Sequence, residues 1–329
     1  MDAGAADLGF APPWWLRNAH VQSIVPSLPL RRVLVMRRCA RLRTLSRAVV
    51  LDCGDGVRLL AHHTPASQPR PAGAVLMLHG WEGDANALYM LSLARRLLAR
   101  GFEVLRLNLR DHGGTQQLNP GLFHSCLLPE VIGAVRQAQR MFAGLPLHLA
   151  GFSLGGNFLL RVSADAAPAG LDIASCVAIS PVLEPRATLA AIESGATIYH
   201  RYFVNKWSGS LRAKQRAWPH LYRFESLGRR ASLRAMTAEL VARYTAFKSL
   251  EEYLDGYAIT GARLARLAVP ATIITAADDP IVPVADLERV AVGGRLRAIV
   301  TARGGHCGFL TGLLGDTWAE NAVVAQLTR

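Results

Sequence analysis

A glycine-flanked serine between a strand-like run and a helix-like run constrains this fold more than any other feature. The apolar run 147–153 leads into Gly151-Phe152-Ser153-Leu154-Gly155, a G-x-S-x-G sequence, and an amphipathic run follows. A serine at a sharp strand-to-helix turn adopts a strained backbone, and small residues on either side let the neighbouring chain approach closely. We therefore predict that Ser153 presents its hydroxyl group at a helix N-terminus, where the helix dipole favours developing negative charge.

Short apolar runs alternate with longer amphipathic runs from about residue 48 onward, which predicts an α/β fold with a mostly parallel sheet. The first two strands form a hairpin, because Asp55-Gly56 supplies the positive φ angles that a tight turn requires. The expected strands are 48–52, 57–63, 74–80, 102–109, 147–153, 176–180, 271–278 and 297–302. The expected helices between and after them are 87–100, 129–144, 154–165 and 317–328.

Residues 185–268 interrupt this alternation, because no strand is evident there and helical segments follow one another. The segment is longer than one crossover between parallel strands needs, so we predict a helical cap or lid insertion; crossover helices with long loops are the alternative. The α/β core then comprises 48–184 and 269–329, and residues 1–47 form an N-terminal extension packed on it. Aromatic side chains of the insertion either line a pocket or pack it onto the core: Tyr199, Tyr202, Phe203, Trp207, Trp218, Tyr222 and Phe224.

A serine hydroxyl group needs a base to take its proton, and two loops that follow predicted strands offer the partners. His306 lies in the glycine-rich loop between the last strand and the last helix and is the candidate base. Asp279 follows the penultimate strand and is the candidate acid, while the neighbouring Asp278 is assigned to capping or a backbone contact. Glu184, after the preceding strand, is the alternative acid. The order serine, aspartate, histidine is typical of α/β-hydrolases.

The negative oxygen that forms during acyl transfer needs two backbone N–H donors. Leu154, directly after the serine, is one predicted donor, and Trp81 in the loop after the strand 74–80 is the other. His79 at the start of that loop is open to interpretation as a second base, but bracing of the loop is favoured.

The formal net charge of +13 comes almost entirely from arginine. The arginine clusters at 31–47 and 212–234 have two interpretations. They attract a membrane surface or an acidic partner through their summed electric field, or they reflect a GC-rich genome in which arginine is used in place of lysine. The chain has no zinc finger and no RNA-recognition sequence, so a nucleic-acid partner is not expected.

The five cysteines are scattered and form no C-x-x-C motif, so they indicate neither a disulfide framework nor a zinc site. Asp2 and Asp7 lie where a signal peptide would be basic, and no apolar run approaches the length of a membrane-spanning helix. We therefore expect a soluble, cytoplasmic protein. Nucleotide-binding and zinc-protease motifs do not occur in the sequence, and no cofactor is expected.

Taken together, several motifs resemble those of the YheT-like family of α/β-hydrolase esterases, which are relatives of the mammalian abhydrolases that act on medium-chain phospholipids. The motifs are W-x-x-N-x-H-x-Q at 15–22, HGWEG at 79–83, GFSLGGN at 151–157, AADDPIVP at 276–283 and GGHCGF at 304–309. The chain departs from the family at Arg110-Asp111-His112-Gly113, where the family commonly has R-G-C. The pocket near that loop is therefore expected to differ.

The resemblance implies an α/β-hydrolase fold with an eight-stranded sheet and hydrolysis of a carboxylic ester without a cofactor. Ser153 would be the nucleophile, His306 the general base and Asp279 the residue that orients it, acting on a small-molecule ester or lipid with a short- to medium-chain acyl group. The same three residues also suit a thioesterase, an acyltransferase or a cofactor-free peroxidase, and a non-catalytic ligand-binding module is the alternative outside enzymes. The sequence gives no role for His20 or Gln22 and no oligomeric state.

Overall fold

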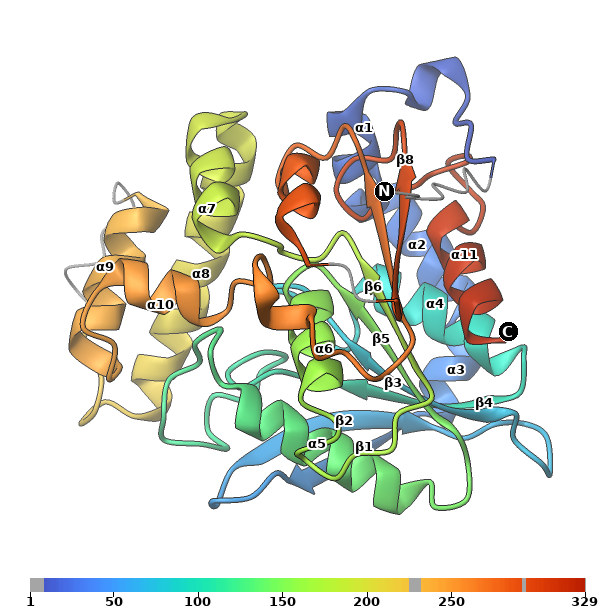
Figure 1. Ribbon diagram of the computed structural model, residues 1–329, viewed down its shortest axis with the longest axis horizontal. Coiled ribbons are helices and arrows are strands. Elements are labelled where there is room, and N and C mark those ends of the chain that lie inside the picture. Colours follow the sequence, from blue (N-terminus) through green and yellow to red (C-terminus); the bar gives the residue numbers. More distant parts are fainter. Residues whose placement is uncertain (1–8, 225–231, 292–293, 329) are drawn as a thin grey trace.

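One eight-stranded sheet runs through the part of the chain that this computed structural model describes, residues 9–224, 232–291 and 294–328 (Figure 1). The strands are β1 (Arg47–Asp52), β2 (Arg58–Thr64), β3 (Gly73–Leu78), β4 (Phe102–Leu107), β5 (Leu147–Phe152), β6 (Ser175–Ile179), β7 (Ala271–Ala276) and β8 (Leu296–Thr301). Their order across the sheet is β1-β2-β4-β3-β5-β6-β7-β8. Within the described ranges, only the pairs β1–β2 and β2–β4 are antiparallel, so the predicted mostly parallel α/β fold is confirmed.

The predicted opening hairpin is present between β1 and β2. Asp55 and Gly56 have φ angles of 51° and 74°, as the turn requires, and the N–H of Cys53 donates to the carbonyl oxygen of Val57 at 2.8 Å. Asp2, Asp7 and residues 225–231 of the second arginine cluster lie outside the described residues.

The helices include those expected between the strands and a further set at the N-terminus. They are α1 (Ala19–Ile24), α2 (Pro29–Arg38), α3 (Ala40–Leu45), α4 (Leu88–Leu98), α5 (Leu128–Met141), α6 (Leu154–Ala164), α7 (Pro185–Ser194), α8 (Thr197–Ala217), α9 (Leu233–Tyr244), α10 (Leu250–Gly256) and α11 (Trp318–Leu327). Short 3₁₀ helices are η1 (Trp14–Leu16), η2 (Val25–Ser27), η3 (Ala262–Leu264) and η4 (Val284–Arg289). Among the described residues, no helix combines the length and apolar character that a membrane span requires.

Alternate residues of β3 face two separate hydrophobic cores. Val75 and Met77 pack with α2, α3, α4 and α11, whereas Leu76 and Leu78 pack with α5 and α6. Both faces of the central strands are therefore covered, and every residue of β3 is buried, as expected for a parallel strand between helical layers. The carboxyl ends of the parallel strands share one edge of this sheet, where binding residues of such folds gather.

Residues 185–268, here called the cap segment, form helices α7–α10 at one side of the core (Figure 1). A buried ion pair ties the segment to the core, because the Nζ of Lys214 in α8 lies 2.7 Å from the Oδ1 of Asp111 after β4. The same Nζ donates to the carbonyl oxygens of Asn119 and Gly121, both at 2.7 Å. Burial lowers the pKa of Lys214 and raises that of Asp111, although each charge favours the other. The contact thus depends on both partners being present.

Replacement of Lys214 by methionine should lower the free energy of unfolding by about 3–5 kcal/mol, because it leaves the carboxylate of Asp111 buried without its cation. Urea denaturation followed by circular dichroism measures this loss. The matched control is Lys248→Met, which removes the same charge from an exposed site and should leave stability nearly unchanged. Equal stability of the two variants would show that the ion pair does not anchor the cap segment.

Candidate active site

Ser153 lies at the turn from β5 into α6, with φ of 49° and ψ of −118°. Such a conformation is strained for a residue with a Cβ atom, and it persists only where the surrounding structure holds it. The N–H of Ser153 donates to the carbonyl oxygen of Ile179 at 2.8 Å. A Cβ atom at Gly151 would come within 2.7 Å of the Gly155 backbone, so the glycines of the motif are required by close packing.

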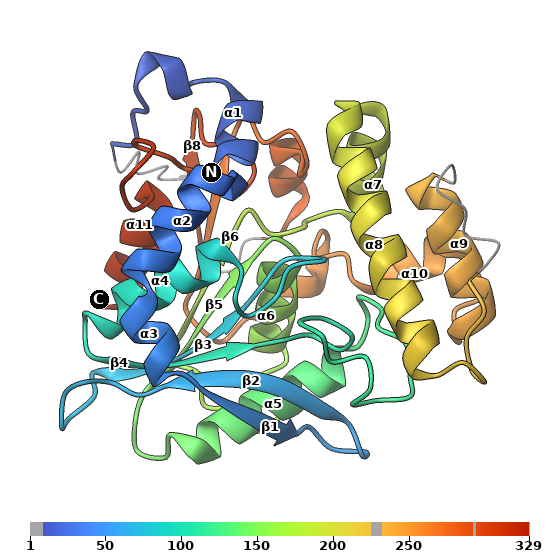
Figure 2. The ribbon, with the colours of Figure 1, turned by 180° about the vertical axis from the view of Figure 1, so that it is seen from behind.

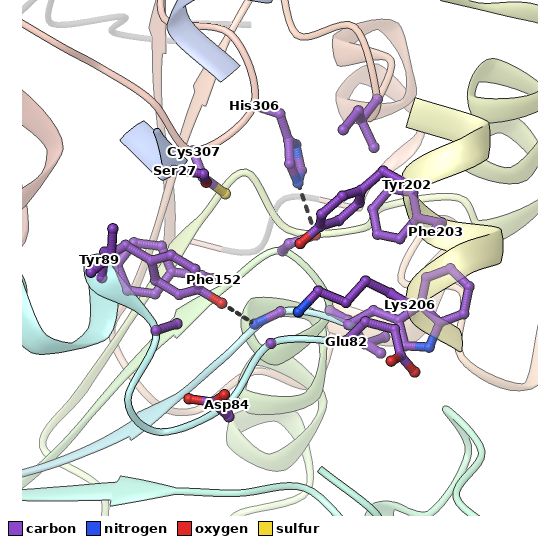
Figure 3. Close-up of a pocket in the computed structure, with 18 of the residues that line it drawn as sticks. Ser27, Glu82, Asp84, Tyr89, Phe152, Tyr202, Phe203, Lys206, His306 and Cys307 are labelled. Atoms are coloured by element: carbon purple, nitrogen blue, oxygen red, sulfur yellow. Dashed lines mark hydrogen bonds between the residues drawn. The ribbon is translucent and has the colours of Figure 1, made fainter. Parts of the chain in front are cut away.

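His306 contacts both of its expected partners. Its Nε2 lies 3.0 Å from the Oγ of Ser153, which is the bond drawn as a dashed line from His306 in Figure 3. Its Nδ1 lies 2.8 Å from the Oδ2 of Asp279. Because an ionised carboxylate only accepts hydrogen bonds, Nδ1 carries a proton and donates it, so in the neutral imidazole Nε2 accepts from the serine hydroxyl group. The three side chains therefore form one hydrogen-bonded series at the carboxyl edge of the sheet.

The environment shifts the pKa of His306 above its ordinary value. Burial alone lowers this pKa, but the charge of Asp279, together with its hydrogen bond and a contribution from Cys307, outweighs burial. The side chain of Asp279 is fully buried, and its Oδ1 accepts from the N–H groups of Ile281 and Val282 at 2.9 and 3.0 Å. These backbone hydrogen bonds thus hold the carboxylate of Asp279 in position for its contact with the imidazole.

The two other acids that the sequence offers have different contacts. Asp278 accepts from the N–H of Gly305 at 2.9 Å and so holds the histidine loop, as its assignment to a backbone contact predicted. Glu184 accepts from the N–H of Arg186 at the start of α7 and from the hydroxyl group of Thr260. These contacts give Glu184 a role in capping α7.

The two expected oxyanion donors flank Ser153. Leu154 is the first residue of α6, and the loop of Trp81 passes so close that a Cβ atom at Gly80 would lie 3.2 Å from the Cβ of Ser153. In the described part of the chain, no acceptor is bonded to the N–H of Trp81 or of Leu154. Both groups are available to a negative oxygen beside the serine.

His79 braces the loop of Trp81. Its Nε2 accepts from the N–H of Leu109 at 3.2 Å, and its Nδ1 lies 2.7 Å from the carbonyl oxygen of Gly80. Burial, with a smaller contribution from His112, lowers the pKa of His79 to about 3, so the imidazole stays neutral. Its two nitrogens are occupied by the backbone, which matches the bracing interpretation.

The N-terminal motif W-x-x-N-x-H-x-Q, whose last two polar residues had no derivable role, holds the histidine loop. Asn18 caps α1 by accepting from the N–H of His20 and Val21. Gln22 is fully buried; its Oε1 accepts from the N–H of Leu310 at 2.6 Å and its Nε2 donates to the carbonyl oxygen of the same residue at 3.2 Å. The motif was visible in the sequence, but its partners lie almost a whole chain length away.

Two further contacts join α1 to the site. The Oγ of Ser23 accepts from the N–H of His306 at 2.8 Å. The Nδ1 of His20 lies 2.9 Å from the hydroxyl group of Tyr199 in α8, so α1 also touches the cap segment. Ser23 was not among the predicted site residues, and its only sequence signal is its place directly after the motif.

A cavity of about 1100 Å³ opens at Ser153 and His306, between the core, α1, α2 and the cap segment. Tyr202, Phe203 and Lys206 of α8 point toward it, as Figure 3 shows. The Trp81 ring stacks on Phe203 with centroids 5.1 Å apart, which joins the loop of the candidate donor to α8. The insertion's aromatic residues divide between the two roles considered for them: some line the cavity (Tyr199, Tyr202, Phe203, Trp207), and others pack the cap segment onto itself and the core (Trp218, Tyr222, Phe224).

Comparison with known proteins places this arrangement in a family. A sequence model of the alpha/beta hydrolase family matches residues 75–313, which is well over half of the chain. The chain belongs to the alpha/beta hydrolase family. Among solved structures of this fold, the Pyrococcus furiosus esterase Pf2001 is 17% identical with a TM-score of 0.57, covering 86% of this chain and 92% of that one.

Two curated relatives narrow the place of this alpha/beta hydrolase within the family. It is 27% identical to "Putative esterase YheT" of Escherichia coli (strain K12), over 97% of this chain and 93% of that protein. It is 21% identical to "Phospholipase ABHD3" of Mus musculus, over 77% of this chain and 61% of that protein. The resemblance to the YheT-like family is confirmed.

Among the described residues, no group of three histidine, cysteine or acidic side chains is arranged to hold a metal ion.

Replacement of Asp279 by asparagine should lower the pKa of His306, because it removes the charge that raises this pKa against the effect of burial. Titration of the imidazole nitrogens by nuclear magnetic resonance measures the shift. Asp278→Asn is the matched control, since Asp278 bonds to the backbone of Gly305. If both variants titrate like the parent chain, the contact between Asp279 and His306 does not govern the imidazole.

Proposed function

We propose that this alpha/beta hydrolase cleaves carboxylic esters through an acyl-enzyme on Ser153. The observation that supports this most is the hydrogen-bonded series from Ser153 through His306 to a buried carboxylate, facing a large cavity. The names of the two curated relatives, an esterase and a phospholipase, point to the same bond.

In the first half of the proposed reaction, the Oγ of Ser153 attacks the ester carbonyl carbon while the Nε2 of His306 takes the hydroxyl proton. The carbonyl π electrons move to oxygen, and the N–H groups of Trp81 and Leu154 donate to that oxygen. Each such donor contributes roughly 3 kcal/mol to stabilisation of the transition state in enzymes where it has been removed. When the tetrahedral intermediate collapses, the alcohol leaves with the proton from Nε2.

In the second half, water enters the place of the alcohol and attacks the acyl carbon. His306 takes a proton from this water and returns it to the Oγ of Ser153, so the free acid leaves and the starting state is restored. Asp279 neither gains nor loses a proton during the reaction. Its negative charge stabilises the imidazolium of His306, which forms once in each half of the cycle. Because only the neutral imidazole accepts a proton, the attack requires a pH at which His306 is deprotonated, and its raised pKa moves that range upward.

A short- to medium-chain acyl group fits the proposal best. The aromatic and aliphatic side chains that line the cavity come from α7, α8 and the Trp81 loop, and they offer apolar surface directly beside Ser153. The acyl chain would lie against this surface, and the alcohol portion would lie toward α1 and α2.

Hydrolysis of p-nitrophenyl esters of increasing acyl length tests the proposal. We expect turnover that is highest for short or medium chains and falls roughly 10⁴-fold or more in Ser153→Ala, because the nucleophile is gone. Ser194→Ala, which removes an exposed hydroxyl group at the end of α7, should retain full activity. A folded parent chain that cleaves no ester, or a Ser153→Ala variant as active as the control, would contradict the proposal.

A further inference from the structure

The described part of the N-terminal extension is basic and contains no acidic residue. From Gly9 to Leu51 the sequence has neither aspartate nor glutamate, and Asp52 is the first acid after Asp7. Exposed arginines follow one another along α2 and α3: Arg32, Arg37, Arg38, Arg41 and Arg43. Within the described ranges, none of these five forms an ion pair, so their charge faces solvent uncompensated.

Apolar side chains are exposed among these arginines. Leu30 is 67% exposed and Val33 is 49% exposed, and with Arg37 they follow the spacing of one stripe along α2. The opposite side of α2 is the one that packs, with Arg31 and Val35 buried. The outer face of α2 is therefore both apolar and basic, whereas the solvent-facing side of a helix is ordinarily polar.

A neighbouring turn extends this face. The guanidinium group of Arg31 donates to the carbonyl oxygens of Leu313 and Gly315, which holds the turn beside the start of α2. Leu313 and Leu314 of that turn are exposed. We call Leu28, Leu30, Val33, Leu313 and Leu314, with Arg32, Arg37 and Arg38, the α2 face.

The α2 face adjoins the cavity of the candidate active site. Arg32, Val35 and Met36 of α2 line that cavity together with Ser27 of η2. Figure 2 shows α2 on the outer side of the molecule, with α1 and η1 at its upper end. Trp14 in η1 is 79% exposed, and an indole ring of this kind favours the boundary between water and lipid.

We propose that the α2 face docks on a lipid surface that carries anionic headgroups. Exposed leucine and valine side chains enter the boundary between headgroups and acyl chains, and the arginines pair with headgroup phosphates. A second copy of this chain fits the face poorly, because two such faces would oppose unpaired arginines. The docking itself is independent of catalysis; that it brings lipid esters to the cavity rests on the proposed esterase function.

Sedimentation with lipid vesicles tests this proposal. We expect the chain to bind vesicles of equal parts phosphatidylglycerol and phosphatidylcholine, to bind pure phosphatidylcholine far more weakly, and to be released as salt rises. Arg37→Gln/Arg38→Gln should weaken binding by about thirtyfold, from the attraction of two arginines near an anionic surface. Leu30→Ser/Val33→Ser should weaken it as well, because less apolar surface is buried.

Two controls separate this proposal from its alternatives. Arg140→Gln/Arg295→Gln makes the same change in charge on exposed residues of α5 and of the loop before β8, and it should bind like the parent chain. Ser153→Ala should also bind normally, so that failure of the docking and failure of the esterase proposal remain distinguishable. No binding to anionic vesicles, an equal loss in the control pair, or binding to duplex DNA in place of vesicles would overturn the α2 face as a lipid-docking surface.

Discussion

The hydrogen bond between His306 and the buried carboxylate of Asp279 fixes the chemistry of the candidate site. It keeps one proton on Nδ1, so Nε2 has its lone pair free toward Ser153. The backbone N–H groups of Ile281 and Val282 donate to this carboxylate, so the loop after β7 determines its position. The strained turn at Ser153 and the Trp81 loop then bring the proposed nucleophile and the candidate oxyanion donors close to this imidazole.

The N-terminal segment acts on this imidazole through the loop that carries it. Gln22 bonds to both backbone groups of Leu310, and Ser23 accepts from the N–H of His306. A side chain at Gly305 would collide with Ser23 and Gln22, and Gly308 packs against the backbone of Gln22. The motif W-x-x-N-x-H-x-Q and the glycines around His306 thus pack against each other as one unit.

The sequence predicted the parts of the site that local patterns determine. Glycine spacing within a few residues predicts the turn at Ser153. Apolar periodicity over a similarly short range predicts the strands that precede Asp279 and His306. The role of Gln22 could not be predicted, because its partner Leu310 is 288 residues away. Lys214 was hidden for the same reason: its partner Asp111 is 103 residues distant. The one sequence signal for this contact was Asp111 itself, which stands where the family commonly has glycine. Its φ of 61° is one that glycine adopts readily, and its carboxylate pairs with Lys214 of the cap segment.

Covalent labelling by a fluorophosphonate, followed by peptide mass spectrometry, tests whether Ser153 is an activated nucleophile. The probe reports an activated serine whatever the natural ester is, because it needs only the nucleophile, its base and the oxyanion donors. We expect one adduct, on Ser153, formed by the parent chain and lost or greatly slowed in His306→Ala. No adduct on a correctly folded chain, or an adduct on a different serine, would contradict it and favour a ligand-binding role for the cavity.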